Sequence, residues 1–180
     1  MTSLAKPTHI LLLTGSPGIG KSTLIGKVAS QLSQYRIGGF CTEEIREAGQ
    51  RKGFRLVTFN GEAGIMAHVN FDHHYRVSKY GVDVEMIDHF ADTTLTLADD
   101  IDVYLIDEIG KMECFSQRFV TRVETLLNSN KPVIATIAKK GSGLIEKAKQ
   151  WPGSEIWELT FANRDARVAE VSKWLATHCE

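Results

Sequence analysis

The sequence predicts an α/β fold in which a mostly parallel sheet is flanked by helices. Short apolar runs alternate with segments whose apolar residues recur at helical spacing, and this alternation is typical of βα units. A glycine-rich loop separates the first apolar run from the first helical segment. Between residues 37 and 70 the pattern changes to segments separated by turn residues, which predicts an antiparallel hairpin insert beside the parallel core.

The first strand and the first helix are expected in the N-terminal part of the chain. Residues 9–14 form an almost continuous apolar run, as expected for a strand that is covered on both faces. After Gly20 the apolar residues recur every three to four positions, which indicates one buried helix face. The apolar positions of this helix are Leu24, Ile25, Val28 and Leu32.

The insert is predicted to be an antiparallel meander of three segments. They comprise residues 37–46, 54–60 and 65–70. Turn residues at 48–50 and 60–61 separate them, and Gly is typical of such tight turns.

The second half of the chain returns to alternating strands and helices. Strands are predicted at residues 101–106, 132–137 and 155–160. Pro132 is compatible with its strand because the first position needs no ladder N–H group. Helices are expected from Glu85 onward, through Phe119, Val120, Val123, Leu126 and Leu127, and through Val168, Val171 and Leu175.

Length and composition indicate one globular domain over residues 1–180. Hydrophobic residues make up 43% of the 180 residues and charged residues 24%, which excludes a disordered or collagen-like chain. The formal net charge of −1 disfavours nucleic acid as a partner and gives no general attraction to anionic membranes. No apolar run approaches the roughly 20 residues of a membrane helix. We therefore expect a cytoplasmic protein without a membrane partner.

The local charge distribution points to an anion site near the N-terminus. The first 42 residues contain four Lys and Arg side chains and no Asp or Glu. The same region contains a phosphate-binding pattern, because residues 15–22 match G-x-x-x-x-G-K-[ST], the P-loop motif. The candidate nucleotide-binding residues are Gly15, Ser16, Pro17, Gly18, Ile19, Gly20, Lys21, Ser22 and Thr23.

Each position of this motif has a physical reason. Glycines allow positive φ and a close approach of the backbone to a phosphate, so that successive N–H groups point into one concavity. We expect Lys21 to reach the β- and γ-phosphates and the Ser22 hydroxyl to bind Mg²⁺. The motif lies between a predicted strand and a predicted helix, which is the context that it requires. A glycine-rich turn without a ligand is the alternative.

A P-loop also needs a carboxylate near the metal ion at the end of a neighbouring strand. Asp107 directly follows the predicted strand at residues 101–106 and is the candidate for this role. The adjacent Glu108 is expected to point differently and to orient a water molecule. The alternative is that the acidic pair belongs to a solvated turn.

These motifs make the chain similar to a known family, the small nucleoside-triphosphatases often called cancer-related nucleoside-triphosphatases. The similarity covers almost the whole chain. It rests on Gly15 to Leu24, on Gly39 to Arg46 followed by Arg51 to Phe54, on Asp107 to Glu113 and on Asn163 to Asp165. The resemblance implies a P-loop fold close to that of nucleotide kinases. It also implies Mg²⁺-dependent hydrolysis of ATP, GTP, CTP and UTP to the diphosphate and phosphate, with loose base selectivity. Ser22 stands where Thr is the commoner choice.

Three further residues are candidates for the site. Lys111 follows the acidic pair and is expected to stabilise charge at the γ-phosphate, unless it is a surface lysine. Thr136 ends a predicted strand and either holds a water molecule or reflects β-propensity. Arg164 begins the last helix, where its guanidinium either stacks on a base or forms a salt bridge.

The predicted hairpin carries a basic cluster of Arg46, Arg51, Lys52 and Arg55. A second anionic substrate is one interpretation of this cluster, and protection of an exposed sheet edge is the other.

Two other functions stay open beside hydrolysis. The first is a nucleotide or small-molecule kinase whose acceptor binds at the hairpin. The second is a nucleotide-binding switch or adaptor with negligible turnover.

Overall fold

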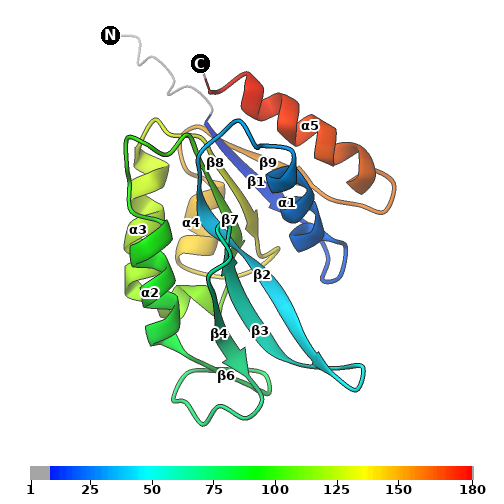
Figure 1. The fold of residues 1–180 in the computed structure, drawn as a ribbon, viewed down its shortest axis with the longest axis vertical. Coiled ribbons are helices and arrows are strands. Elements are labelled where there is room, and N and C mark those ends of the chain that lie inside the picture. The colour runs from blue at the N-terminus through cyan, green and yellow to red at the C-terminus, as the bar shows by residue number, and fades with distance from the viewer. Residues whose placement is uncertain (1–8, 180) are drawn as a thin grey trace.

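The computed structural model describes residues 9–179, which form one nine-stranded sheet with helices on both faces (Figure 1). The strands are β1 (Ile10–Thr14), β2 (Ile37–Glu47), β3 (Gln50–Thr58), β4 (Ala63–His68), β5 (Arg76–Val77), β6 (Tyr80–Val82), β7 (Val103–Ile109), β8 (Val133–Ile137) and β9 (Ser154–Glu158). The helices are α1 (Lys21–Ser30), α2 (Val84–Thr94), α3 (Gln117–Asn128), α4 (Leu144–Lys149) and α5 (Arg164–Ala176), with a 3-10 turn at Glu113–Phe115.

The sheet combines a parallel half and an antiparallel half. Its order is β5-β6-β4-β3-β2-β7-β8-β1-β9. Strands β2, β7, β8, β1 and β9 are mutually parallel, whereas β2, β3, β4, β6 and β5 pair antiparallel. The predicted α/β class is confirmed. The insert does not stand beside the parallel core, however, because the long strand β2 belongs to both halves.

Strand β2 is long enough to pair with strands of both halves. Its first residues, Ile37 to Phe40, pair with β7, and from Phe40 onward the strand pairs with β3. In Figure 1 the β2–β3 hairpin therefore extends beyond the end of the parallel strands. The predicted meander is confirmed with shifted boundaries. The sequence did not indicate β5, β6 or α4, which are only two, three and six residues long.

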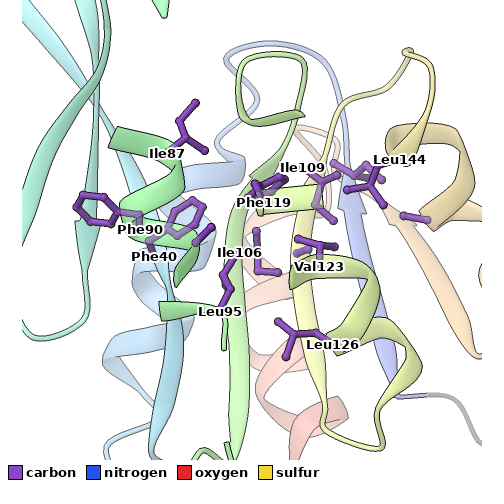
Figure 2. Close-up of a cluster of buried hydrophobic side chains, with 14 of the residues drawn as sticks. Phe40, Ile87, Phe90, Leu95, Ile106, Ile109, Phe119, Val123, Leu126 and Leu144 are labelled. Carbon is purple, nitrogen blue, oxygen red and sulfur yellow. The ribbon is translucent and has the colours of Figure 1, made fainter. Parts of the chain in front are cut away.

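Side chains alternate between the two faces of the sheet along each strand, and this creates two hydrophobic cores, one on each face. Neighbouring strand residues point to opposite faces, so Leu11 and Leu13 pack under α1 and α5, whereas Ile10 and Leu12 pack on the opposite side. Figure 2 shows this second core, where aromatic and aliphatic side chains of α2 and α3 meet the sheet. Phe40 lies at its centre, with ring centroids 6.4 Å from Phe90 and 6.3 Å from Phe119.

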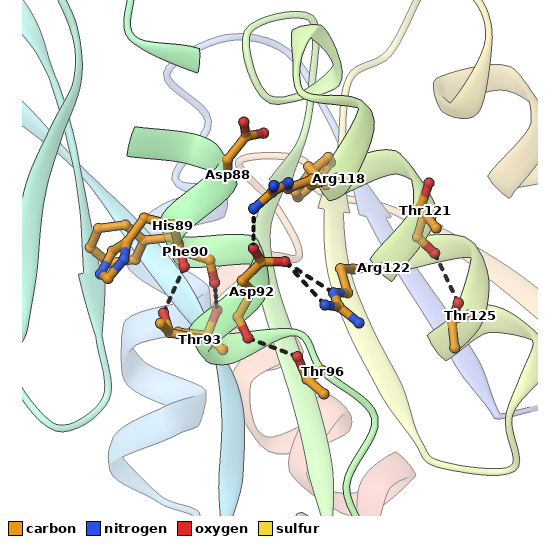
Figure 3. A network of polar contacts seen from close by, with 12 residues as sticks. Asp88, His89, Phe90, Asp92, Thr93, Thr96, Arg118, Thr121, Arg122 and Thr125 are labelled. Atoms are coloured by element: carbon orange, nitrogen blue, oxygen red, sulfur yellow. Dashed lines mark hydrogen bonds and ion pairs between the residues drawn. The ribbon is translucent and has the colours of Figure 1, made fainter. Parts of the chain in front are cut away.

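Helices α2 and α3 are also joined by an ion-pair network (Figure 3). Asp92 accepts hydrogen bonds from Arg118 at 2.6 Å and from Arg122 at 3.1 Å. All three side chains are at least partly exposed, so solvent screens these ion pairs and their contribution to stability is small. The apolar contacts of the two helices therefore do more to fix their relative position than this network does.

The fold brings the candidate site residues to one edge of the sheet. Parallel strands share the edge at which their carboxyl ends lie, and ligands of open α/β sheets bind there. The phosphate loop follows β1, Thr136 lies near the end of β8, and Asp107 lies in β7. Asp107 and Glu108 are inside β7 rather than after it, because this strand extends to Ile109, which pairs with Ile137. Among residues 9–179, no helix has the length and apolarity to cross a membrane.

Candidate active site

The phosphate loop has the backbone shape of an anion site. Gly20 caps α1 with φ 107°, in the left-handed region that favours glycine, and no side chain hydrogen-bonds to the first turn. The first turn of α1 contains no acidic residue. Its N–H groups and the positive end of the helix dipole are therefore available to a phosphate.

Lys21 folds back over this loop. Its Nζ atom donates to the carbonyl oxygens of Gly15 at 3.0 Å and Ser16 at 3.4 Å. Burial raises the pKa values of Asp107 and Glu108, and the charge of Lys21 partly opposes this rise. The ammonium group thus lies between the loop and the acidic residues, where it can neutralise phosphate charge.

Asp107 is a buried residue whose carboxylate accepts two hydrogen bonds. It is only 1% exposed. Its Oδ1 accepts a hydrogen bond from the Thr136 hydroxyl at 2.8 Å, and its Oδ2 accepts one from the Thr42 backbone N–H at 3.1 Å. The Thr42 hydroxyl donates to the carbonyl oxygen of Asp107. Burial raises the pKa of Asp107, whereas the hydroxyls of Ser22 and Thr136 and the N–H of Thr42 lower it. The contacts with Thr42 and Thr136 therefore fix the orientation of this carboxylate.

Glu108 faces a different set of neighbours. A Cβ atom added at Gly110 would lie 2.5 Å from Oε1 of Glu108 and 2.8 Å from Oε2 of Glu113. The two carboxyl groups therefore converge on the space that glycine leaves free. Burial raises the pKa of Glu108, and the charge of Lys21 partly opposes this. For Glu113, which is 4% exposed, burial and then the charge of Glu108 raise the pKa well above its usual value.

The donor set fits Mg²⁺ completed by substrate. Ser22 and Asp107 offer oxygen atoms, which Mg²⁺ prefers, and Mg²⁺ usually takes one or two protein ligands beside phosphate oxygens and water. Within residues 9–179 no group of three His, Cys, Asp or Glu side chains is arranged to hold a metal ion alone. The charge of Lys21 acts on both Asp107 and Glu108, so two acidic groups face one ammonium group and an added cation would be stabilised here.

The remaining predicted residues lie at different distances from the loop. Arg164 reaches it, because Nη1 donates to the carbonyl oxygen of Ile19 at 3.2 Å. Within residues 9–179 its guanidinium contacts this carbonyl oxygen and the Phe161 ring instead of a carboxylate, so the salt-bridge interpretation is not supported. Lys111 is exposed after β7, and its role at the γ-phosphate stays a prediction. The Thr136 hydroxyl donates a hydrogen bond to Asp107, so it positions that carboxylate instead of donating to water.

Sequence reasoning did not single out three residues of this region. Thr42 was only part of the family-like segment that starts at Gly39, and its contact with Asp107 spans 65 positions. Glu113 was named only as a member of the segment after Asp107. Phe161 carried no signal, although it is 77% exposed on the turn that contacts the phosphate loop. A cavity of about 770 Å³ lies elsewhere, and none of the predicted site residues lines it.

Glu113→Gln is expected to flatten the pH dependence of stability. The raised pKa means that the folded protein keeps a proton that the unfolded chain releases above pH 4.5. The free energy of unfolding therefore falls as pH rises from that value, and Gln has no proton to lose. Urea denaturation of both proteins in buffers from acidic to mildly alkaline pH measures this. Glu47→Gln, at an exposed position of the hairpin, is the control. Parallel curves for the parent and Glu113→Gln would contradict the prediction.

Comparison with known proteins gives a consistent set of relatives. A model of the NTPase family matches residues 10–172. Nucleoside-triphosphatase THEP1 of Caldivirga maquilingensis is 45% identical over 171 residues, which cover 93% of this chain and 95% of that protein. Nucleoside-triphosphatase THEP1 of Thermotoga petrophila is 42% identical over 162 residues, which cover 89% of each chain.

Two solved structures share the fold. The crystal structure of THEP1 from the hyperthermophile Aquifex aeolicus aligns with a TM-score of 0.84 at 34% identity, over 92% of this chain and 98% of that one. The solution structure of a human cancer-related nucleoside triphosphatase aligns with a TM-score of 0.80 at 32% identity, over 94% and 98% of the two chains. The family resemblance and the P-loop fold inferred from the motifs are thus confirmed, and the chain belongs to the NTPase family of nucleoside-triphosphatases.

Proposed function

We propose that this protein hydrolyses nucleoside 5'-triphosphates to the diphosphate and phosphate with Mg²⁺ as cofactor. The observation that carries the proposal is the meeting of Lys21, Ser22 and the buried Asp107 beside the phosphate loop. These are the groups that P-loop enzymes use on the β- and γ-phosphates and on the metal ion. The names of the relatives support the same reaction.

The roles follow from the contacts. Backbone N–H groups within residues 15–23 would bind the phosphates, except at Pro17, which has none, and at Ile19, whose N–H donates to the Ser16 carbonyl oxygen. Lys21 would neutralise the charge that develops on the γ-phosphoryl group. Ser22 and Asp107 would hold Mg²⁺, which supplies charge neutralisation at the β- and γ-oxygens when it is bound. Glu108 would orient the attacking water. The water oxygen then bonds to the γ-phosphorus while the bond to the bridging oxygen breaks, and positioning and electrostatics provide most of the acceleration.

Turnover by the isolated protein is expected to be slow. Arg164 contacts the phosphate loop, but its guanidinium is held by the carbonyl oxygen of Ile19. Lys111 would replace an arginine at the γ-phosphate only in part. In related enzymes, an arginine supplied by a partner protein accelerates hydrolysis by a factor of about 10³ to 10⁵. Steady-state phosphate release with saturating ATP, GTP, CTP or UTP should therefore stay far below the roughly 1 to 100 s⁻¹ of kinases.

Three outcomes of that experiment decide between the functions. Slow release with all four substrates supports hydrolysis with loose base selectivity. Stoichiometric binding without turnover would instead identify a switch or adaptor. A rate within the kinase range without a partner would show that the site is already complete, and Lys111 and Arg164 would be the first residues to replace.

A specific observation favours a second substrate as an alternative. A cavity of about 550 Å³ is lined by Arg46, Arg51 and Lys79, beside the aromatic rings of Phe54 and Tyr80. Glu44 pairs with both arginines, at 2.7 Å and 2.9 Å, so one carboxylate offsets only part of the positive charge. The cavity also touches Met112, which lies between the candidate residue Lys111 and the buried Glu113.

We therefore keep an anionic second substrate in this cavity as the alternative proposal. Arg55 is not part of it, because Arg55 pairs with Glu43 at 2.8 Å and does not line the cavity. Adding candidate phosphorylated acceptors to the phosphate-release assay tests the proposal. A rate that rises into the kinase range with one acceptor, and the appearance of its phosphorylated product, would favour the kinase.

A cytoplasmic location and one domain over residues 1–180 also remain proposals.

A further inference from the structure

Phe161 is a large apolar side chain that the fold leaves in solvent. It is 77% exposed, whereas the other exposed large apolar residues of the described chain are 41–44% exposed. It lies on the turn between β9 and α5, which is well ordered by hydrogen bonds. The Thr160 N–H donates to the Asn163 side-chain oxygen at 2.8 Å, and the Asn163 amide donates to the carbonyl oxygen of Glu158 at 2.9 Å.

Arg164 connects this ring to the phosphate loop. Its guanidinium carbon lies 5.0 Å from the centroid of the Phe161 ring, and its Nη1 donates to the carbonyl oxygen of Ile19. A Cβ atom added at Gly15, at the other end of the loop, would lie 3.0 Å from the carbonyl oxygen of Leu159. The turn thus packs against both ends of the phosphate loop, and Arg164 holds the Phe161 ring beside the loop.

The order of the strands gives the direction of a bound triphosphate. The loop follows β1, which lies between β8 and β9. Asp107 in β7, together with Thr136 in β8, lies on one side of β1. Phe161 follows β9, on the other side. If the γ-phosphate lies near Asp107 and Glu108, the opposite end of the molecule points toward Phe161.

We propose that the base of the nucleoside triphosphate stacks on the exposed face of Phe161, with Arg164 behind the ring as its support. The inference rests on the proposed function. Stacking on an aromatic ring accepts every base because each has a π-face. We call the exposed face of the Phe161 ring the platform. Stacking on it would explain how one site binds ATP, GTP, CTP and UTP without selecting among them.

Binding measurements on Phe161→Ala test the platform. The ligands are non-hydrolysable β,γ-analogues of the four triphosphates and inorganic tripolyphosphate, which has phosphates but no base, each with Mg²⁺ in a calorimeter. Loss of one base–aromatic stack should weaken binding of all four analogues about tenfold. Tripolyphosphate binding should not change. Phe161→Tyr keeps a ring and should keep the parent affinity, and Leu97→Ala, at another exposed apolar residue, should have no effect.

Several results would overturn the platform. Unchanged affinity of Phe161→Ala for the four analogues is one. An equal loss for tripolyphosphate is another, because the substitution would then act on the phosphate loop. If the parent binds tripolyphosphate as tightly as the analogues, the base contributes nothing and the platform fails while the proposed function stands. If the parent binds none of these ligands, the proposed function fails with it.

Discussion

Lys21→Ala is expected to lose most triphosphate binding and nearly all turnover. The ammonium group lies over the phosphate loop and offsets the negative charge of Asp107 and Glu108. Charge-assisted hydrogen bonds contribute about 1.5–3 kcal/mol each, so affinity should fall about ten- to a hundredfold. The loss of charge stabilisation in the transition state should slow the chemical step by a further factor of about 10² to 10³, the effect of removing one oxyanion-hole donor.

The measurement pairs triphosphate titration with steady-state phosphate release. Lys27→Ala is a matched control, because Lys27 lies exposed on the same helix α1 and outside the phosphate loop. Circular dichroism and thermal unfolding establish that both variants are folded. A folded Lys21→Ala protein that hydrolyses ATP at the parent rate would refute the assignment of the phosphate loop.

Asp107→Asn and Glu108→Gln are expected to impair different steps. Asp107→Asn keeps the shape of the site, since the amide oxygen can accept from the Thr42 N–H and the amide nitrogen can donate to the Thr136 hydroxyl. The amide lacks the negative charge that Mg²⁺ needs, so this variant should require more Mg²⁺. Glu108→Gln should keep triphosphate binding and slow hydrolysis by about 10² to 10⁴, the usual contribution of a positioned acid or base.

Two titrations separate these roles. Phosphate release measured against Mg²⁺ at fixed ATP should shift to higher Mg²⁺ for Asp107→Asn and not for Glu108→Gln. Triphosphate affinity measured at saturating Mg²⁺ should be close to the parent value for Glu108→Gln. Loss of binding by Glu108→Gln, with an unchanged rate per bound nucleotide, would show that the two roles were assigned wrongly.

The elements that could be predicted from the sequence are those with long or locally constrained patterns. The strand–loop–helix unit around residues 15–22 is one, because glycine torsions and helical spacing act between near neighbours. The meander was predicted from turn residues that are also local. Strands β5 and β6 and helix α4 escaped prediction, since two, three and six residues are too few to show a period.

The site was predictable only where its residues are close in the chain. Lys21 and Ser22 were found from one motif, and Asp107 and Glu108 were found as a pair after a predicted strand. Of the groups that orient Asp107, Thr42 was not singled out, and Thr136 was named as a site candidate without its contact to Asp107. The contacts of Asp107 with Thr42 and Thr136 span 65 and 29 positions, and they depend on β2 and β8 flanking β7.

The sequence by itself determined the α/β class, the phosphate loop and the family, because each follows from spacing and torsion among neighbouring residues. Only the tertiary structure decided which side chains surround Asp107, why the carboxyl groups of Glu108 and Glu113 converge beside Gly110, and why Phe161 is exposed beside the loop. These placements depend on strand order and on the burial of two faces of one sheet. Such packing is a property of the whole chain, and no local pattern of residues encodes it.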